Sequence, residues 1–177
     1  FIRVSLGLHL WSFQQCTEAE MAALIGRHIN RIDKKGRISV PKQFRDALSD
    51  QGFPGIYVYP SFKNPVIEAC GEEFIQRIVA SLDDLELFSD EQDDLASTIL
   101  ENSHQLPYDT EGRIVLPKTI LKHADIKFEA VFVGRGNRFQ VWEPSAYEIH
   151  NSNSFSRARN RGATLRLRAG KGSELAQ

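Results

Sequence analysis

The sequence predicts an α+β, β-rich fold in which one small module occurs twice along the chain. The segment IDKKGRISVPK at residues 32–42 recurs 76 residues later as YDTEGRIVLPK at residues 108–118, and six of the eleven positions are identical. Each copy lies among short runs that alternate polar and apolar residues, as half-buried strands do. Two copies are fewer than a solenoid requires, so the pattern indicates a duplicated domain that pairs with itself.

Each copy of the repeat contains a tight turn with the same chemistry. Asp33 and Gly36 occupy the first and fourth positions of a four-residue stretch, and Asp109 and Gly112 do so in the second copy. A carboxylate at the first position accepts backbone N–H groups, and glycine tolerates the positive φ that such a turn demands. We therefore expect two equivalent β-turns.

A strand and a short helix are predicted after each turn. Residues 37–40 alternate polar and apolar, which places Ile38 and Val40 on the inner side of a half-buried strand. Pro41 and Pro117 suit the first position of a helix, where the missing N–H would have no partner. Each copy is therefore predicted to contain strand, turn, strand and short helix.

A second hairpin is predicted after each short helix. Its strands are rich in β-branched and aromatic residues and fall at residues 55–59, 66–69, 130–133 and 139–142. Apolar residues at helical spacing then predict a helix over residues 72–88, and Pro144 is predicted to open another. Helices thus follow both hairpins.

An acidic helical connector joins the two copies. Ser89 followed three residues later by Gln92 is a capping-box pattern, which predicts a helix over residues 90–102 with a solvated acidic face. The segment after residue 150 is rich in Ser, Arg and Asn, which is typical of a flexible tail. The predicted organisation is a first module at 27–74, the connector at 75–102, a second module at 103–146 and a basic flexible tail at 151–177.

Charge is strongly segregated, although the formal net charge is only −1. Residues 27–45 carry seven Arg or Lys residues against the single acid Asp33, whereas residues 81–101 carry eight acids and no Arg or Lys. A chain that is not basic overall can bind nucleic acid only through a local patch. We expect one surface to attract phosphate and another to repel it.

Composition also limits the environment and the cofactors. No apolar run approaches the roughly 20 residues that a membrane-spanning helix needs, so we expect no membrane partner. The chain has only two cysteines, which indicates the reducing environment of a cytoplasmic location. Cys16 and Cys70 are too few and too far apart for a disulfide framework or a zinc site. We expect Cys70 to be an inert packing residue and the protein to bind no metal.

The first 20 residues are predicted to lie outside the folded protein. The sole methionine is Met21, which suggests that translation begins there and that residues 1–20 are a non-native or untranslated extension. The rival interpretation is a signal peptide, since residues 4–13 are moderately apolar. Arg3 is its only positive residue, and residues 14–17 make a poor cleavage site.

Three sets of residues together carry a family resemblance. They are GRHINRID at 26–33, both Asp-x-x-Gly-Arg motifs with their following Pro, and VGRGNRFQVW at 133–142. On these motifs the chain resembles the MraZ family over residues 21–149; members of that family carry two SpoVT-AbrB-type domains. The resemblance implies duplicated AbrB-like (swapped-hairpin or double-psi-like) β-barrel modules. It also implies a ring-shaped homo-oligomer and a nucleoid-associated repressor, which binds repeated promoter elements of double-stranded DNA upstream of the division and cell-wall gene cluster.

The basic residues around the turns are the candidate DNA contacts. Arginine can contact guanine O6 and N7 in a bidentate manner, so Arg31 and Arg37 are candidates for base readout, while lysines are expected to meet phosphates. The full set of candidate DNA-binding residues is Arg31, Lys34, Lys35, Arg37, Lys42, Arg113 and Lys118. The residues expected to organise the turns are Asp33, Gly36, Asp109 and Gly112.

A structural role for the two motif arginines is the alternative interpretation. Arg37 and Arg113 would then pair with Asp33 and Asp109 and do no more than hold each hairpin. The second copy lacks the two lysines of the first turn, so we expect the first copy to contribute more to DNA binding.

Other classes of function are less compatible with the sequence. It contains no nucleophile elbow, phosphate loop or metal-ligand cluster, so we expect neither an enzyme nor a cofactor. GRGNRF at 134–139 lacks the third glycine of a nucleotide-binding loop and is better explained as a hairpin turn. An AbrB-class antitoxin and a structural oligomer without DNA binding remain as alternatives.

Overall fold

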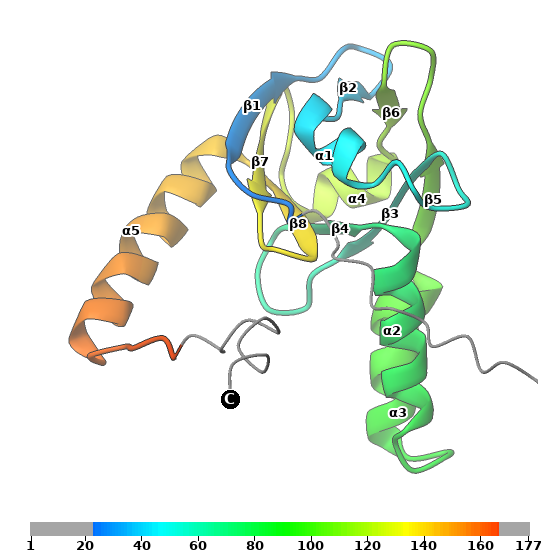
Figure 1. Cartoon of the computed structure of the whole chain (residues 1–177), viewed down its shortest axis with the longest axis vertical. Helices are drawn as coiled ribbons and strands as arrows, with labels where there is room; N and C mark the ends of the chain where they lie inside the picture. The colour runs from blue at the N-terminus through cyan, green and yellow to red at the C-terminus, as the bar shows by residue number, and fades with distance from the viewer. Residues whose placement is uncertain (1–22, 167–177) are drawn as a thin grey trace, which may run out of the picture.

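The computed structural model describes residues 23–166, and its elements follow the same order in both copies (Figure 1). The first copy contains β1 (Arg27–Arg31), β2 (Arg37–Ser39), α1 (Lys42–Ala47), β3 (Gly55–Pro60) and β4 (Ile67–Cys70). The second contains β5 (His104–Pro107), β6 (Arg113–Val115), α4 (Lys118–His123), β7 (Glu129–Gly134) and β8 (Arg138–Trp142). The predicted α+β, strand-rich class is confirmed.

The remaining elements are helical. The connector consists of α2 (Glu72–Asp83), α3 (Asp90–Ala96) and the π-helical turn η1 (Ser97–Glu101), and α5 (Pro144–Asn160) follows β8. None of the helices within residues 23–166 is long and apolar enough to cross a membrane. The predicted extension at residues 1–20 and the last part of the predicted tail, residues 167–177, lie outside the described residues.

Strands of the two copies are interleaved in one antiparallel six-stranded sheet of order β1-β7-β8-β4-β3-β5. β1 of the first copy pairs with β7 of the second, and β5 of the second copy pairs with β3 of the first. β2 and β6 pair with each other in a separate two-stranded sheet, which we call the central ribbon. Each copy therefore supplies strands that complete the sheet of the other.

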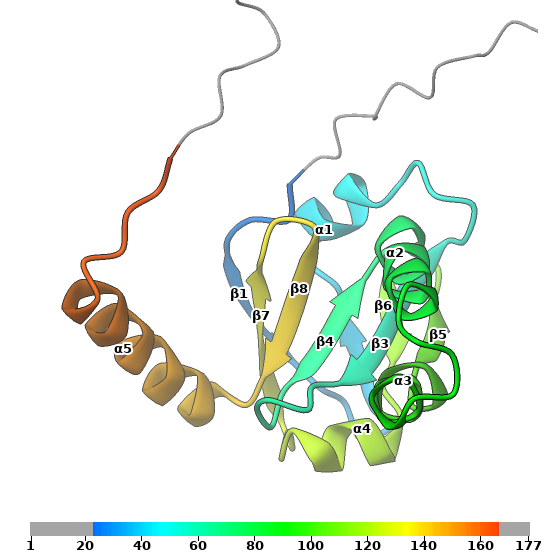
Figure 2. The same ribbon diagram turned by 90° about the horizontal axis from the view of Figure 1, so that it is seen from below.

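The large sheet is curved, and the central ribbon lies across from β8 and β4 (Figure 1). The short helices α1 and α4 lie at opposite ends of this arrangement (Figure 2). β1 and β5 remain the edges of the sheet, so no closed barrel of the predicted kind was found among the described strands.

The hydrophobic core is shared by the two copies. Ile38 and Ile114 face each other in the central ribbon, and each side chain is 1% exposed in the same core cluster. The predicted inward orientation of Ile38 is thereby confirmed. The fully buried Phe44 ring lies 5.0 Å from the ring of Phe139, centroid to centroid. Cys70 is also fully buried, and burial raises the pKa of its thiol to about 12, as expected for an inert packing residue.

Two helical predictions differ from the structure. The helix predicted over residues 72–88 ends at Asp83, and α3 begins at Asp90 after Ser89, whose hydroxyl accepts the N–H of Gln92 at 3.2 Å. The flexible tail predicted from residue 151 instead begins as helix, since α5 continues to Asn160. The physical reason is that residues 151–160 contain neither glycine nor proline, so nothing interrupts the helix that starts at Pro144.

The shared core gives a test of stability. We expect Phe44→Ala to lower the free energy of unfolding by about 3–5 kcal/mol, because it removes a fully buried ring and leaves a cavity. Denaturant unfolding followed by circular dichroism measures the change. Phe62→Ala is the control, because Phe62 is 60% exposed and its loss should change stability little. Equal effects of the two substitutions would contradict the assignment of the core.

Candidate nucleic-acid interface

The first turn, residues 33–36, is organised by the carboxylate of Asp33. Its Oδ1 accepts the backbone N–H groups of Lys35 at 2.8 Å and Arg37 at 2.9 Å. Its Oδ2 accepts Nε–H of Arg37 at 2.6 Å. Gly36 closes the turn with a φ of +78°, a left-handed conformation that a side chain would disfavour. The turn and the arginine are thus held by the same carboxylate.

The second turn, residues 109–112, repeats this arrangement. Oδ1 of Asp109 accepts the N–H groups of Glu111 and Arg113, both at 2.9 Å. Its Oδ2 accepts Nε–H of Arg113 at 2.7 Å, and Gly112 has a φ of +71°. Equivalent residues in the two copies therefore produce equivalent local structures.

The central ribbon brings the two motif arginines to one face. Arg37 lies opposite Val115, and Ser39 lies opposite Arg113, on either side of the buried pair of isoleucines. Side chains alternate between the faces of a strand, so these four residues share the outer face. Arg37 and Arg113 are diagonal neighbours across the ribbon, a relation that usually separates Cβ atoms by roughly 7 Å. One surface therefore carries an arginine from each copy.

Both turn carboxylates are held in the ionised form. The N–H of Arg37 is the largest factor that lowers the pKa of Asp33, to about 2, and the Arg37 side chain and the N–H of Lys35 lower it further. The pKa of Asp109 is lowered for the corresponding reasons, with the N–H of Arg113 first. The pKa of Arg113 is raised, chiefly by its hydrogen bond to Asp109. Both ion pairs therefore persist at neutral pH.

The two turns differ in the charge that surrounds them. The first turn and its arginine contain three cations and one acid, and Lys34 and Lys35 are exposed. The second contains one cation and two acids, because Thr110 and Glu111 replace the two lysines. Oε2 of Glu111 lies 2.7 Å from Nη1 of Arg113. In the described part of the chain, no hydrogen bond engages the Nη atoms of Arg37. The first turn is therefore the more attractive to an anion.

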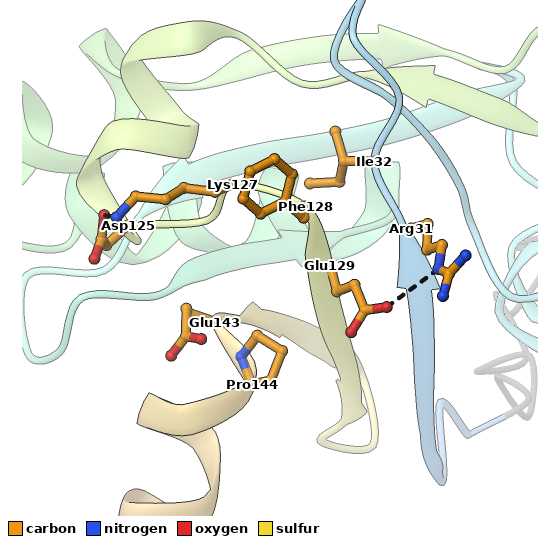
Figure 3. Close-up of a pocket in the computed structure, with 8 residues that line it drawn as sticks. All are labelled: Arg31, Ile32, Asp125, Lys127, Phe128, Glu129, Glu143 and Pro144. Atoms are coloured by element: carbon orange, nitrogen blue, oxygen red, sulfur yellow. Dashed lines mark hydrogen bonds and ion pairs between the residues drawn. The ribbon is translucent and has the colours of Figure 1, made fainter.

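The other candidate residues lie farther from the outer face of the ribbon. Lys42 and Lys118 are exposed at the starts of α1 and α4, at opposite ends of the fold. Arg31 ends β1 and is 88% exposed, and its Nε lies 3.2 Å from Oε1 of Glu129 on β7. Figure 3 shows this ion pair at one side of a pocket that Phe128 also lines. The guanidinium of Arg31 is thus already paired with the carboxylate of Glu129.

Arg45 is a charged residue near the second turn that the sequence prediction missed. It lies on α1, donates from Nε to the carbonyl of Val40 at 3.2 Å, and is half-buried. A Cβ added to Gly112 would lie only 2.4 Å from the Arg45 guanidinium carbon, so Arg45 packs directly on the second turn. In the second copy the equivalent position is Leu121. An arginine at a position where the other copy has an apolar residue is the sequence signal that could have identified Arg45.

Comparisons with known proteins agree on one family. The family described as "MraZ protein, putative antitoxin-like" matches residues 99–167. A relative from Pelagibacter ubique named "Transcriptional regulator MraZ" is 47% identical over 137 residues, which cover 77% of this chain and 88% of the relative. A protein of the same name from Rickettsia typhi is 38% identical, over 82% of this chain and 98% of the relative. One from Rickettsia akari is 36% identical over the same shares.

The contribution of the first turn to the free energy of unfolding should depend on pH. The folded-state pKa of Asp33, about 2, lies below its ordinary value of 3.8, so its contribution is present above about pH 4 and is lost as the pH falls toward 2. We expect the difference in unfolding free energy between the wild type and Asp33→Asn to shrink over this range. Denaturant unfolding at a series of pH values measures it.

Asp46→Asn is the matched control for this experiment. It removes one negative charge from an exposed position of α1 and leaves both turns intact. A wild-type advantage over Asp33→Asn that is the same at pH 6 and pH 2 would show that the carboxylate does not stabilise the turn in its ionised form.

Proposed function

The chain belongs to the MraZ family of transcriptional regulators, and on this basis we propose that it is a sequence-specific DNA-binding repressor. Its targets would be repeated promoter elements upstream of the division and cell-wall gene cluster, bound by a ring-shaped homo-oligomer at the nucleoid. The observation that carries DNA binding is the outer face of the central ribbon, where Arg37 and Arg113 lie together beside exposed lysines.

Arg37 is proposed as the main base-reading residue. Its Nε is held by Asp33, which fixes the guanidinium, while its Nη atoms have no hydrogen bond in the described part of the chain. A fixed guanidinium loses less conformational entropy on binding and can present two N–H groups to guanine O6 and N7. The ion pair with Asp33 thus positions the arginine, and it does not rule out a role in binding DNA.

The remaining basic residues would have supporting roles. Four exposed lysines would neutralise phosphates, namely Lys34, Lys35, Lys42 and Lys118. Arg31 would read a second base, and in doing so it would exchange its contact with Glu129 for one with DNA. Glu111 repels phosphate and occupies Nη1 of Arg113, so the second copy would contribute less than the first.

An oligomer would strengthen a weak individual contact. One chain offers a single ribbon, and several chains at fixed spacing would bind repeated elements with a high effective concentration. We propose that both copies derive from an AbrB-type module. The match to a family described as antitoxin-like supports one second candidate, an antitoxin that binds a toxin. Co-purification of a small toxic protein with the tagged chain would support it.

Two substitutions separate base reading from phosphate binding. We expect Arg37→Ala to reduce discrimination between the operator and unrelated DNA by about 1–3 kcal/mol, because a bidentate base contact is lost. We expect Lys34→Ala to weaken binding to all sequences alike and to lower the salt slope of log K by roughly one. Gel-shift or anisotropy titrations of DNA from upstream of the chain's own gene, over a series of salt concentrations, measure both.

Lys63→Ala is the control, because it removes an exposed cation outside the ribbon. If Arg37→Ala and Lys34→Ala both bind operator and unrelated DNA as the control does, the ribbon is not the DNA-binding surface. If the wild type shows no affinity for its own upstream DNA at low salt, the proposed DNA-binding function is wrong.

A further inference from the structure

Two helical projections extend from the body of the protein in different directions. Figure 1 shows the connector helices α2 and α3 side by side below the sheet, and Figure 2 shows α5 extending on the opposite side. Only the first part of α5 touches the body, where Tyr147 is buried against Trp142. From Ser152 to Asn160 the only half-buried residue is Ser154, so most of this helix presents its surface to solvent.

The first projection ends in a tip that is both acidic and apolar. We call residues 83–94 the acidic tip; they contain seven acids and no Arg or Lys. Leu87 and Phe88 lie at its end and are 66% and 91% exposed. A solvated acidic surface alone does not require large apolar side chains to be displayed among its charges.

The backbone of the acidic tip is arranged so that Phe88 is displayed. Phe88 has a φ of +65°, a conformation that bulky residues rarely adopt. It is maintained by the side chain of Gln92, which accepts the N–H of Phe88 at 3.0 Å, and by the N–H of Ser89, which bonds to the carbonyl of Glu86 at 3.1 Å. Strained backbone positions cluster at functional sites, and here the strain leaves an aromatic side chain in water.

The second projection, α5 with the residues that follow it, is basic where the first is acidic. After Glu148, no acid occurs as far as residue 166, and four arginines follow, at positions 157, 159, 161 and 166. We call residues 155–166 the basic end. Phe155 is 69% exposed and lies one turn before Arg159, so both project from the same side of α5. The basic end therefore offers an aromatic side chain together with cations.

We propose that the acidic tip of one copy binds the basic end of a second copy of this chain. The proposal rests on the homo-oligomer of the proposed function and names the surfaces that form it. Opposite charge determines which surfaces meet, and Leu87, Phe88 and Phe155 supply the apolar part of the contact. The basic end could also meet DNA, but DNA would leave the acidic tip without a partner and repel it.

The geometry makes this contact intermolecular and repeating. The two projections leave the body on opposite sides, so the tip and basic end of one chain do not meet each other (Figure 2). Each chain then carries one acidic tip and one basic end. A contact between two different surfaces of this kind is called heterologous. Such contacts close into a ring or continue as a filament, depending on the rotation between neighbours.

Charge reversal on each surface, followed by mixing, tests the contact. The first variant carries Arg157→Glu, Arg159→Glu and Arg161→Glu. The second carries five reversals, Asp83→Lys, Asp84→Lys, Glu86→Lys, Asp93→Lys and Asp94→Lys, so that lysines outnumber the acids left in the tip. Each variant has two surfaces of like charge, so we expect each to sediment as a monomer where the wild type sediments as an oligomer. An equimolar mixture restores opposite charges at every contact and should recover the wild-type mass. Sedimentation velocity at about 0.1 M salt measures all species.

Controls separate this proposal from a loss of folding and from the proposed DNA binding. Lys63→Glu with Lys122→Glu reverses exposed cations outside both projections and should assemble as the wild type does. Phe88→Ser should shift the assembly toward monomer without any change of charge. Circular dichroism should give the same spectrum for all variants, since every substituted side chain is exposed.

The outcomes are distinct. Oligomers formed by either charge-reversed variant alone, or a mixture that stays monomeric, would overturn the contact and leave the DNA-binding proposal in place. A basic-end variant with wild-type mass and weaker DNA affinity would overturn the contact by assigning α5 to DNA. A monomeric wild type would overturn both the contact and the ring.

Discussion

The antiparallel pairing of β2 with β6 joins the two copies at their signature turns. Ile38 and Ile114 meet at its centre and are buried in the shared core, which fixes the register of the ribbon. A shift of one residue would turn both isoleucines toward solvent and both arginines into the core, so the hydrophobic effect specifies which residues face outward. The position of the candidate DNA-binding surface is therefore a consequence of core packing.

Interleaving the copies allows their turns to differ in function while both remain structurally necessary. The second turn still supports the ribbon, and Gly112 provides the space that the Arg45 side chain of the first copy occupies. Glu111 can then reduce the positive charge beside Arg113 without any loss of the turn, because the turn uses the backbone N–H of Glu111 and only Asp109 contributes its side chain as an acceptor. Duplication within one chain permits such divergence, whereas two identical chains would carry every change twice.

Local signals in the sequence predicted the turns and the cap at Ser89, because their hydrogen bonds join residues a few positions apart. Most strands were predicted from the alternation of polar and apolar residues, which is a pattern within each strand. The interleaved sheet could not be predicted in this way, since β1 must find β7 across roughly a hundred residues and alternation does not name a strand's partner. The contact of Arg31 with Glu129 depends on that same pairing. The strained backbone of Phe88 was missed because apolar spacing continued through residue 85 and favoured an unbroken helix.

Charge segregation acquires a physical role if copies assemble through their projections. An exposed basic end would bind any DNA through phosphates, which raises nonspecific affinity without adding discrimination. An acidic tip of a neighbouring copy would cover these arginines and leave the central ribbon as the accessible basic surface. The uncovered face of the ribbon carries Arg37, which Asp33 holds through Nε and whose Nη atoms form no hydrogen bond with the described residues. Assembly would then raise specificity twice, by repeating the ribbon at fixed spacing and by removing competing cations from solvent.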